Sequence, residues 1–251
     1  MNALRPTIQC MLTLYALTLT ANTADAQTYS PLYPTSSSRT LTAGCFDTNG
    51  YFVPNCNVTI STNYYADTNA HTASQHSGSS PLSTVSPSSG NTGTTGLSFT
   101  HITTIVGHAE YIRVCASGGG CTNSNYAVGY TIYYVSDHGI WTLVGQRAEH
   151  GNSTAYNHWM TTNAANGIYN TTVDYQANIS PGLVAVNDMS LPFGGKFDIN
   201  GTWSGDHVAH YLGRDVDVNG TDDVFLDYCT AHGASYTAKH APGNLHSGWP
   251  Y

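Results

Sequence analysis

The chain has 251 residues, of which 7 are Lys or Arg and 15 are Asp or Glu, and its formal net charge is −8. So few cations argue against a phosphate-binding role, and we expect no nucleic-acid partner. Abundant Tyr (18) and Gly (25), with few helix-forming charged residues, favour β structure.

The N-terminal residues have the pattern of a signal peptide. Arg5 gives a positive start, residues 11–19 are apolar, and Ala24-Asp25-Ala26 has the small-x-small form of a cleavage site. We therefore predict that residues 1–26 are removed by cleavage after Ala26 and that the protein is secreted or periplasmic. No later apolar run approaches the ~20 residues needed to cross a bilayer, so we expect no membrane span.

Residues 27–40 are rich in Ser, Thr and Pro, which predicts a flexible leader. From residue 41 to 145, short β-prone runs alternate with turns, a pattern that predicts an immunoglobulin-like β-sandwich. Residues 77–96 are almost entirely Ser, Gly, Thr and Pro, and we expect a mobile loop there.

Five cysteines remain after cleavage, and an oxidising compartment would pair them where geometry allows. Cys115 and Cys121 flank a glycine-rich turn and are predicted to close a hairpin. Cys45 and Cys56 flank a second turn, which leaves Cys229 over. Spacing alone leaves other pairings open.

The pattern changes after residue 145. Residues 159–169 have roughly helical spacing of apolar side chains, residues 183–189 form a compact apolar strand, and residues 215–218 form another strand. We therefore predict two domains, a β-sandwich at 41–145 and an α+β domain at 146–251.

Two histidines and three carboxylates crowd into residues 206–217 of this weakly charged chain. Within that stretch, His210, Gly213 and Asp217 form the pattern His-x-x-Gly-x-x-x-Asp. If the chain turns at the glycine and continues as a strand, the imidazole and the carboxylate can meet at one zinc ion. A third ligand must come from elsewhere, and the C-terminal tail carries His232, His240 and His246. Of these, His246 lies in a short apolar context that suits a returning strand.

Residues 204–218 resemble the metal-binding segment of the penicillin-insensitive murein endopeptidases and, more loosely, the D-Ala-D-Ala carboxypeptidase and hedgehog-type zinc peptidases. That segment reads His-x-x-His-x-x-Gly-x-x-x-Asp, and the turn at residues 191–195 is similar to the one that precedes it. The resemblance spans residues 183–251. It implies a zinc-peptidase-like fold, zinc held by His210, Asp217 and His246, and peptidoglycan peptides as substrate.

The sequence departs from that family at one position of the site. The family has a His-x-His pair near its C-terminus, and here the first histidine is replaced by Asn244. An amide can only hydrogen-bond, so proton transfer would fall to His240 or His207, whose imidazoles titrate near neutrality. Arg214 or Lys196 is a candidate for docking a substrate carboxylate.

Other polar groups have two interpretations each. Asp206 and Asp215 are either carboxylates that fix the tautomer of a ligand imidazole or solvated groups. Solvated side chains are also the alternative for two further clusters: a calcium loop at Asp222, Asp223 and Asp227, and a second metal site at His71 and His76.

These patterns predict an exported zinc-dependent peptidase or amidase-type hydrolase, in which a metal-activated water attacks a peptide amide. The alternative is a non-catalytic secreted binding or adhesion protein, in which the sandwich carries the function and the C-terminal domain is a degenerate peptidase scaffold. The His and Asp pattern favours the enzyme, and Asn244 favours the alternative. The oligomeric state is left open.

Overall fold

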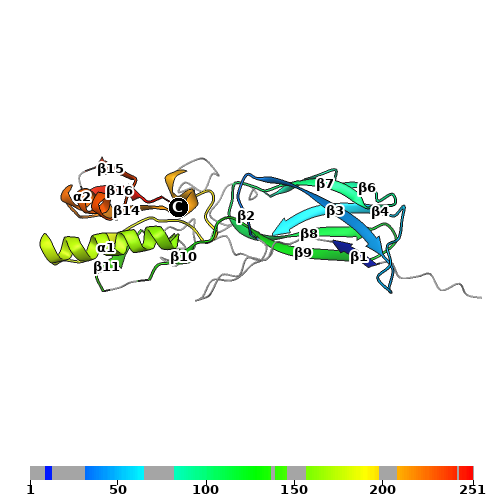
Figure 1. Ribbon diagram of the computed structural model, residues 1–251, viewed down its shortest axis with the longest axis horizontal. Helices are drawn as coiled ribbons and strands as arrows, with labels where there is room; N and C mark the ends of the chain where they lie inside the picture. Colours follow the sequence, from blue (N-terminus) through cyan, green and yellow to red (C-terminus); the bar gives the residue numbers. More distant parts are fainter. Residues whose placement is uncertain are drawn as a thin grey trace, which may run out of the picture. The chain divides into compact units, whose positions relative to one another are not determined.

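The computed structural model describes residues 9–12, 32–64, 82–136, 139–145, 157–197, 208–241 and 243–250. The chain divides into two units (Figure 1). Unit 1 contains residues 1–66, 81–105 and 109–128, and unit 2 contains residues 67–80, 106–108 and 129–251. The domain limits predicted from the sequence, 41–145 and 146–251, stay a prediction.

Unit 1 is built from two β-sheets. The first has the strand order β1 (Gln9–Leu12), β3 (Ser38–Phe46), β7 (Leu97–Ile102), β5 (Thr84–Ser86). The second has the order β2 (Leu32–Tyr33), β9 (Cys121–Val128), β8 (His108–Ala116), β4 (Asn57–Tyr64), β6 (Ser89–Asn91). Strand β1 falls within the predicted signal peptide, most of which lies outside the described residues.

The core of unit 1 follows from the alternation of side chains along its strands. In β4, Val58 and Ile60 are buried while Asn57 and Thr59 are exposed, as the two-residue period of a strand requires. Both sheets contribute to one apolar cluster, with Phe99 of β7 and residues of β3, β4, β8 and β9. The inward faces of the two sheets therefore enclose a common core.

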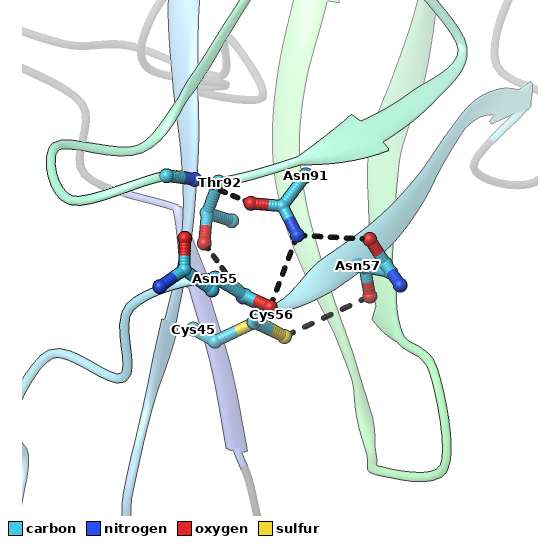
Figure 2. Close-up of a disulfide and its surroundings, with 7 residues drawn as sticks. Cys45, Asn55, Cys56, Asn57, Asn91 and Thr92 are labelled. Atoms are coloured by element: carbon cyan, nitrogen blue, oxygen red, sulfur yellow. Dashed lines mark hydrogen bonds between the residues drawn. A yellow bond between two sulfur atoms is a disulfide. The ribbon is translucent and has the colours of Figure 1, made fainter.

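Both predicted disulfides are present, Cys45–Cys56 and Cys115–Cys121, and Cys229 is a buried free thiol. The first links β3 to the start of β4, in the other sheet of unit 1. Figure 2 shows the polar contacts beside it: the Cys56 amide donates to Oγ1 of Thr92 (3.0 Å), and Nδ2 of Asn91 donates to Oδ1 of Asn57 (3.1 Å). The second disulfide closes the hairpin between β8 and β9.

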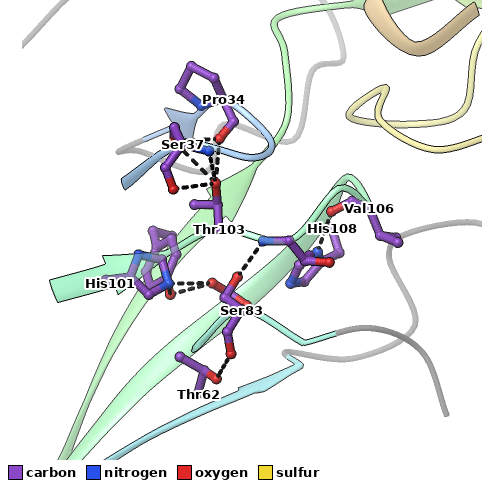
Figure 3. A network of polar contacts seen from close by, with 11 residues as sticks. Pro34, Ser37, Thr62, Ser83, His101, Thr103, Val106 and His108 are labelled. Carbon is purple, nitrogen blue, oxygen red and sulfur yellow. Dashed lines mark hydrogen bonds and ion pairs between the residues drawn. The ribbon is translucent and has the colours of Figure 1, made fainter. Parts of the chain in front are cut away.

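A polar network that includes His101 lies in the interior of unit 1, and Figure 3 shows His101 with its hydrogen bonds. Nε2 of His101 lies 3.1 Å from Oε1 of Glu110 and 2.7 Å from the hydroxyl of Tyr126, which also donates to Glu110. The Arg39 guanidinium stands 4.5 Å above the Tyr126 ring, and burial lowers its pKa to about 10. Burial and the Glu110 carboxylate raise the pKa of Tyr126. Side chains from four strands, β3, β7, β8 and β9, thus form a network around the Glu110 carboxylate, which is fully buried and hydrogen-bonded.

Unit 2 has a mixed five-stranded sheet. Its strand order is β11 (Trp141–Leu143), β13 (Val184–Val186), β14 (Asp215–Asn219), β16 (Asn244–Gly248), β15 (Tyr236–Ala241). Only β11 and β13 pair in parallel. A two-stranded ribbon, β10 (Tyr133–Tyr134) with β12 (Trp159–Met160), completes its strands within the described residues.

Two helices, α1 (Thr162–Asn178) and α2 (Val224–Ala231), pack on one face of this sheet. Helix α1 begins at its cap Thr161, whose hydroxyl accepts a hydrogen bond from the Ala164 amide. Its Tyr175 packs edge-on against Phe225 of α2, with ring centroids 5.1 Å apart. In the part of the chain that the structure describes, no helix is both long and apolar enough to cross a membrane.

Because the helices cover one face of the sheet, the alternating side chains of its strands point either into the core beneath them or to the opposite face. Val216 and Val218 of β14 and Leu245 of β16 belong to the apolar core beneath the helices. Successive side chains of a strand point to opposite faces, so Asp215, Asp217 and His246 lie on the other face of the sheet. The fold therefore places polar groups of two adjacent strands together.

The predicted fold class is wrong. We expected an immunoglobulin-like sandwich followed by an α+β zinc-peptidase-like domain, whereas the described chain is mostly β-sheet with two α-helices. The physical reason lies in the composition, which is poor in Glu, Lys and Arg and rich in Tyr, Thr and Gly along the whole chain.

Candidate metal site

Asp217 and His246 face each other across two antiparallel strands. The pairing of β14 with β16 places Asp217 directly opposite His246, and opposite residues of a pair point to the same face. Nδ1 of His246 lies 2.7 Å from Oδ1 of Asp217, and both residues are buried. The register of the sheet therefore determines this contact, although 29 residues separate the two side chains in sequence.

His210 comes from a short 3-10 helix, η4 (Val208–Leu212), just before β14. The expected turn at Gly213 is present, with φ of +66°, a conformation that favours glycine. A Cβ on Gly213 would lie 2.5 Å from Cγ2 of Ile132, so glycine is also required for space. The turn brings Nε2 of His210 to 3.5 Å from Oδ2 of Asp217.

The three residues predicted as zinc ligands are thus brought together. One ligand atom from each of His210, Asp217 and His246 lies within 4.8 Å of the others, and all three side chains are buried. Among the described residues, this is the one group of three His, Cys, Asp or Glu side chains with that spacing. Two imidazoles and a carboxylate suit Zn²⁺ and similar divalent ions, and leave a further coordination position open.

The charges in the site are mutually dependent. Burial alone lowers the pKa of His246, but its hydrogen bonds with Asp215 and Asp217 outweigh this and raise the pKa to about 9. Burial acts in the opposite sense on Asp217, but His210 and His246 hold the pKa of that carboxyl well below its usual range. Without a metal, the site therefore holds an imidazolium beside a carboxylate near neutral pH.

Asp215 contacts the far side of the His246 ring. Its Oδ1 lies 3.3 Å from Nε2 of His246, while Nδ1 of the same ring faces Asp217. Of the two sequence interpretations of Asp215, the contact with a ligand imidazole matches this geometry, and the solvated group does not. Sequence reasoning missed Gly248, which lies opposite Asp215 and leaves room for its carboxylate.

The candidates for proton transfer and substrate docking are not members of the three-residue group. His240 is exposed on β15, with its ring centroid 5.2 Å from that of His246. His207 lies outside the described residues, as does Asp206. Lys196 is buried and Arg214 is half-buried. The catalytic role of His240 and His207, and the docking role of the two cations, stay predictions.

The other predicted metal clusters have different surroundings. Oδ1 of Asp222 accepts a hydrogen bond from the Tyr175 hydroxyl (3.1 Å), and Oδ2 of Asp223 pairs with Nζ of Lys239 (2.8 Å). These carboxylates therefore have partners within the protein. His71 and His76 lie outside the described residues.

Comparison with known proteins gives no family for this chain. No protein-family model matches it, and no curated protein matches it. The adhesin InvE of Yersinia pseudotuberculosis is similar over 49% of this chain and 32% of its own, with 15% identity and a TM-score of 0.32. Domains 4 and 5 of the S-layer protein SbsC match 49% of this chain and 52% of theirs, with 12% identity and a TM-score of 0.25.

None of these findings connects the chain with zinc peptidases. The predicted membership of the murein endopeptidase and hedgehog-type family is therefore wrong, and so are the hydrolase and metallopeptidase assignments that depended on it. The reason is that the motifs behind the resemblance lie within residues 191–218, a small part of the chain. A short pattern of ligands determines the chemistry of a site but not the family of the protein that carries it.

Proposed function

We propose that this chain is an exported, non-catalytic binding protein whose unit 2 holds a divalent transition-metal ion, with zinc as the first candidate. His210, Asp217 and His246 would be the ligands. One observation carries the proposal: three side chains chosen from sequence as ligands meet within 4.8 Å on one face of the sheet. The imidazole and carboxylate donors fit zinc, and the ion would offer its remaining position to a small molecule or a partner.

The cysteines support export. Two disulfides of unit 1 are compatible with an oxidising compartment, where such bonds persist. The signal-peptide pattern of residues 1–26 agrees with the same destination.

Asn244 supports binding rather than catalysis. It lies on β16 two residues before His246 and therefore on the same face of the sheet. Its amide can hydrogen-bond to a ligand but cannot take up a proton, so this position offers no general base. A metal that anchors a bound partner needs no such base.

The test is zinc binding by purified protein. Wild type stripped with a chelator should take up one zinc ion per chain, measured by titration calorimetry and elemental analysis. His210→Ala, Asp217→Ala and His246→Ala should each weaken zinc binding by more than the roughly 10- to 100-fold cost of losing an outer hydrogen-bond partner.

His232→Ala is the matched control. His232 also pairs with a carboxylate in unit 2, at 2.8 Å from Oδ2 of Asp174, but it is not part of the three-residue group. Its replacement should leave zinc affinity unchanged. A wild-type chain that takes up no zinc, or that loses none on His246→Ala, would overturn the proposal.

A further inference from the structure

We propose that Asp215 is a positioning residue for the metal site, an inference that rests on the proposed function. In this arrangement Asp215 accepts a hydrogen bond from the Nε2–H group of His246. That bond commits Nε2 to carrying the proton and leaves the lone pair of Nδ1 directed toward Asp217 and His210, where the ion would lie.

The two carboxylates of β14, Asp215 and Asp217, make different contacts with the imidazoles. Asp217 presents Oδ1 to Nδ1 of His246 (2.7 Å) and Oδ2 to Nε2 of His210 (3.5 Å), so it lies between the two imidazoles. Asp215, two residues earlier on the same face, reaches only the outer nitrogen of His246, at 3.3 Å. Its side chain is 12% exposed, so water competes little for this contact.

The chemistry explains why an outer carboxylate matters. A neutral imidazole carries its proton on one nitrogen and can ligate only through the other. An ionised acceptor beside Nε2 selects the tautomer that ligates through Nδ1, holds the plane of the ring, and increases the basicity of the ligand nitrogen. Asp215 occupies that position through the geometry of the strand.

Gly248 provides the space for this arrangement. It lies directly opposite Asp215 in the β14–β16 pair. A Cβ at Gly248 would stand 2.2 Å from Oδ1 of Asp215, closer than any real contact, so a side chain there would displace the carboxylate. The orientation of Asp215 therefore depends on the absence of a side chain at position 248.

The experiment is a double-mutant cycle with zinc affinity as the readout. Asp215→Ala should weaken zinc binding about 10- to 100-fold, the usual cost of removing an outer partner of a ligand histidine. Gly248→Ala should cause a similar loss by displacing the carboxylate. The double variant should be no weaker than Asp215→Ala alone, because the clash then has no carboxylate to displace.

Two further arms separate positioning from general stability. Asp215→Asn keeps an acceptor oxygen without the charge and should recover part of the affinity lost in Asp215→Ala. In nitrogen-15 NMR of the zinc-loaded protein, the Nε2 proton of His246 should be observed in wild type and lost to solvent exchange in Asp215→Ala. Asp227→Ala, which removes an exposed carboxylate of α2, is the charge control and should bind zinc as wild type does.

The outcomes distinguish this inference from the proposed function. If wild type binds no zinc, both the metal site and the role of Asp215 are overturned. If wild type binds zinc but Asp215→Ala binds it within twofold of wild type, only the role of Asp215 fails. Additive losses in Asp215→Ala and Gly248→Ala would show that the two residues act separately, which also contradicts the inference.

Discussion

At the scale of single residues, His246 is the group on which the site depends. Both of its ring nitrogens face carboxylates, and its strand places it between the other two predicted ligands and the outer Asp215. A metal-free site of this kind is stabilised by an imidazolium between carboxylates, whereas a metal-loaded site needs the same ring to give up a proton.

The first prediction concerns stability against pH without metal. The pKa of His246 is raised from 6.5 to about 9 on folding. Its contribution to the free energy of unfolding is therefore fully present below about pH 6.5, decreases as the pH rises, and is lost above about pH 9. Urea unfolding in the presence of a chelator should show wild type losing more stability than His246→Gln between pH 6 and pH 9.5. Equal losses in the two proteins would contradict the raised pKa.

The second prediction concerns protons released by zinc. Because the pKa of His246 is about 9, nearly all chains carry the imidazolium at pH 7.5, and zinc must displace its proton. Titration calorimetry in two buffers of different ionisation enthalpy should give a release of about one proton per zinc from this ring. The same measurement on His232→Ala should give the wild-type value, and no buffer dependence in wild type would refute the assignment.

At the scale of elements, the sheet of unit 2 brings the site together and the turn at Gly213 completes it. The alternation in β14 buries Val216 and Val218 under the helices and turns Asp215 and Asp217 to the opposite face. His210 reaches that face only because the chain reverses at a glycine with positive φ. The geometry of the turn should therefore affect both stability and metal binding.

Gly213→Ala tests this element. Alanine at φ of +66° costs about 1–2 kcal/mol, and the contact with Ile132 at 2.5 Å should add about 1–3 kcal/mol of overpacking. Gly220→Ala is the matched control, since Gly220 has φ of +77° and no atom within 4 Å of an added Cβ. Denaturant unfolding should show a larger loss for Gly213→Ala, accompanied by weaker zinc binding. Equal losses without an effect on zinc would show that the turn does not position His210.

The buried network of unit 1 gives a further prediction at this scale. Glu110→Ala leaves His101, Tyr126 and Arg39 without their carboxylate in the core, which typically costs about 3–5 kcal/mol. Circular dichroism during urea unfolding should show this loss. Zinc affinity should not change, because the predicted ligands all belong to unit 2. A stable Glu110→Ala protein would show that the network contributes little.

Sequence patterns predicted local features of these elements and missed others. Cysteine spacing predicted both disulfides, and the His, Gly and Asp pattern placed a turn before a strand where η4, Gly213 and β14 lie. The segment expected to be a loop at 77–96 contains β5 and β6, because backbone pairing with β7 and β4 does not require apolar side chains. The expected helix at 159–169 instead begins after Thr161, and Trp159 belongs to a strand.

The candidate site was predictable only in part, because contacts between distant residues depend on how the strands pair. The meeting of His210, Asp217 and His246 depends on one strand register, which a sequence pattern can suggest once a returning strand is assumed. The network of Glu110, His101 and Tyr126 depends on the pairing of distant strands and carries no spacing signal. Its one trace in the sequence was Glu110, which alternates with the apolar Ile112 and Val114 along β8.

At the scale of the whole molecule, the features that govern stability lie in different units. Both disulfides belong to unit 1, and the predicted ligands belong to unit 2. All four tryptophans also lie in the sequence of unit 2, so their fluorescence reports on that unit. In the intact chain, zinc addition and disulfide reduction should therefore change the stability of different units.

Zinc and reductant test this separation. Zinc at about 100 times its Kd should raise the stability reported by tryptophan fluorescence by about 2.7 kcal/mol. Reduction of the two disulfides should instead lower the stability of unit 1 by about 2–5 kcal/mol, seen by circular dichroism. His246→Ala should abolish the zinc effect and leave the effect of reduction intact. A zinc effect that survives in His246→Ala would place the ion elsewhere in the molecule.

The most direct test of the proposed zinc site is diffraction from zinc-loaded crystals at the zinc absorption edge. We expect one anomalous peak in unit 2, with Nε2 of His210, a carboxylate oxygen of Asp217 and Nδ1 of His246 each about 2.0–2.2 Å from the ion. No peak between these side chains, or a zinc ion bound at other residues, would contradict it.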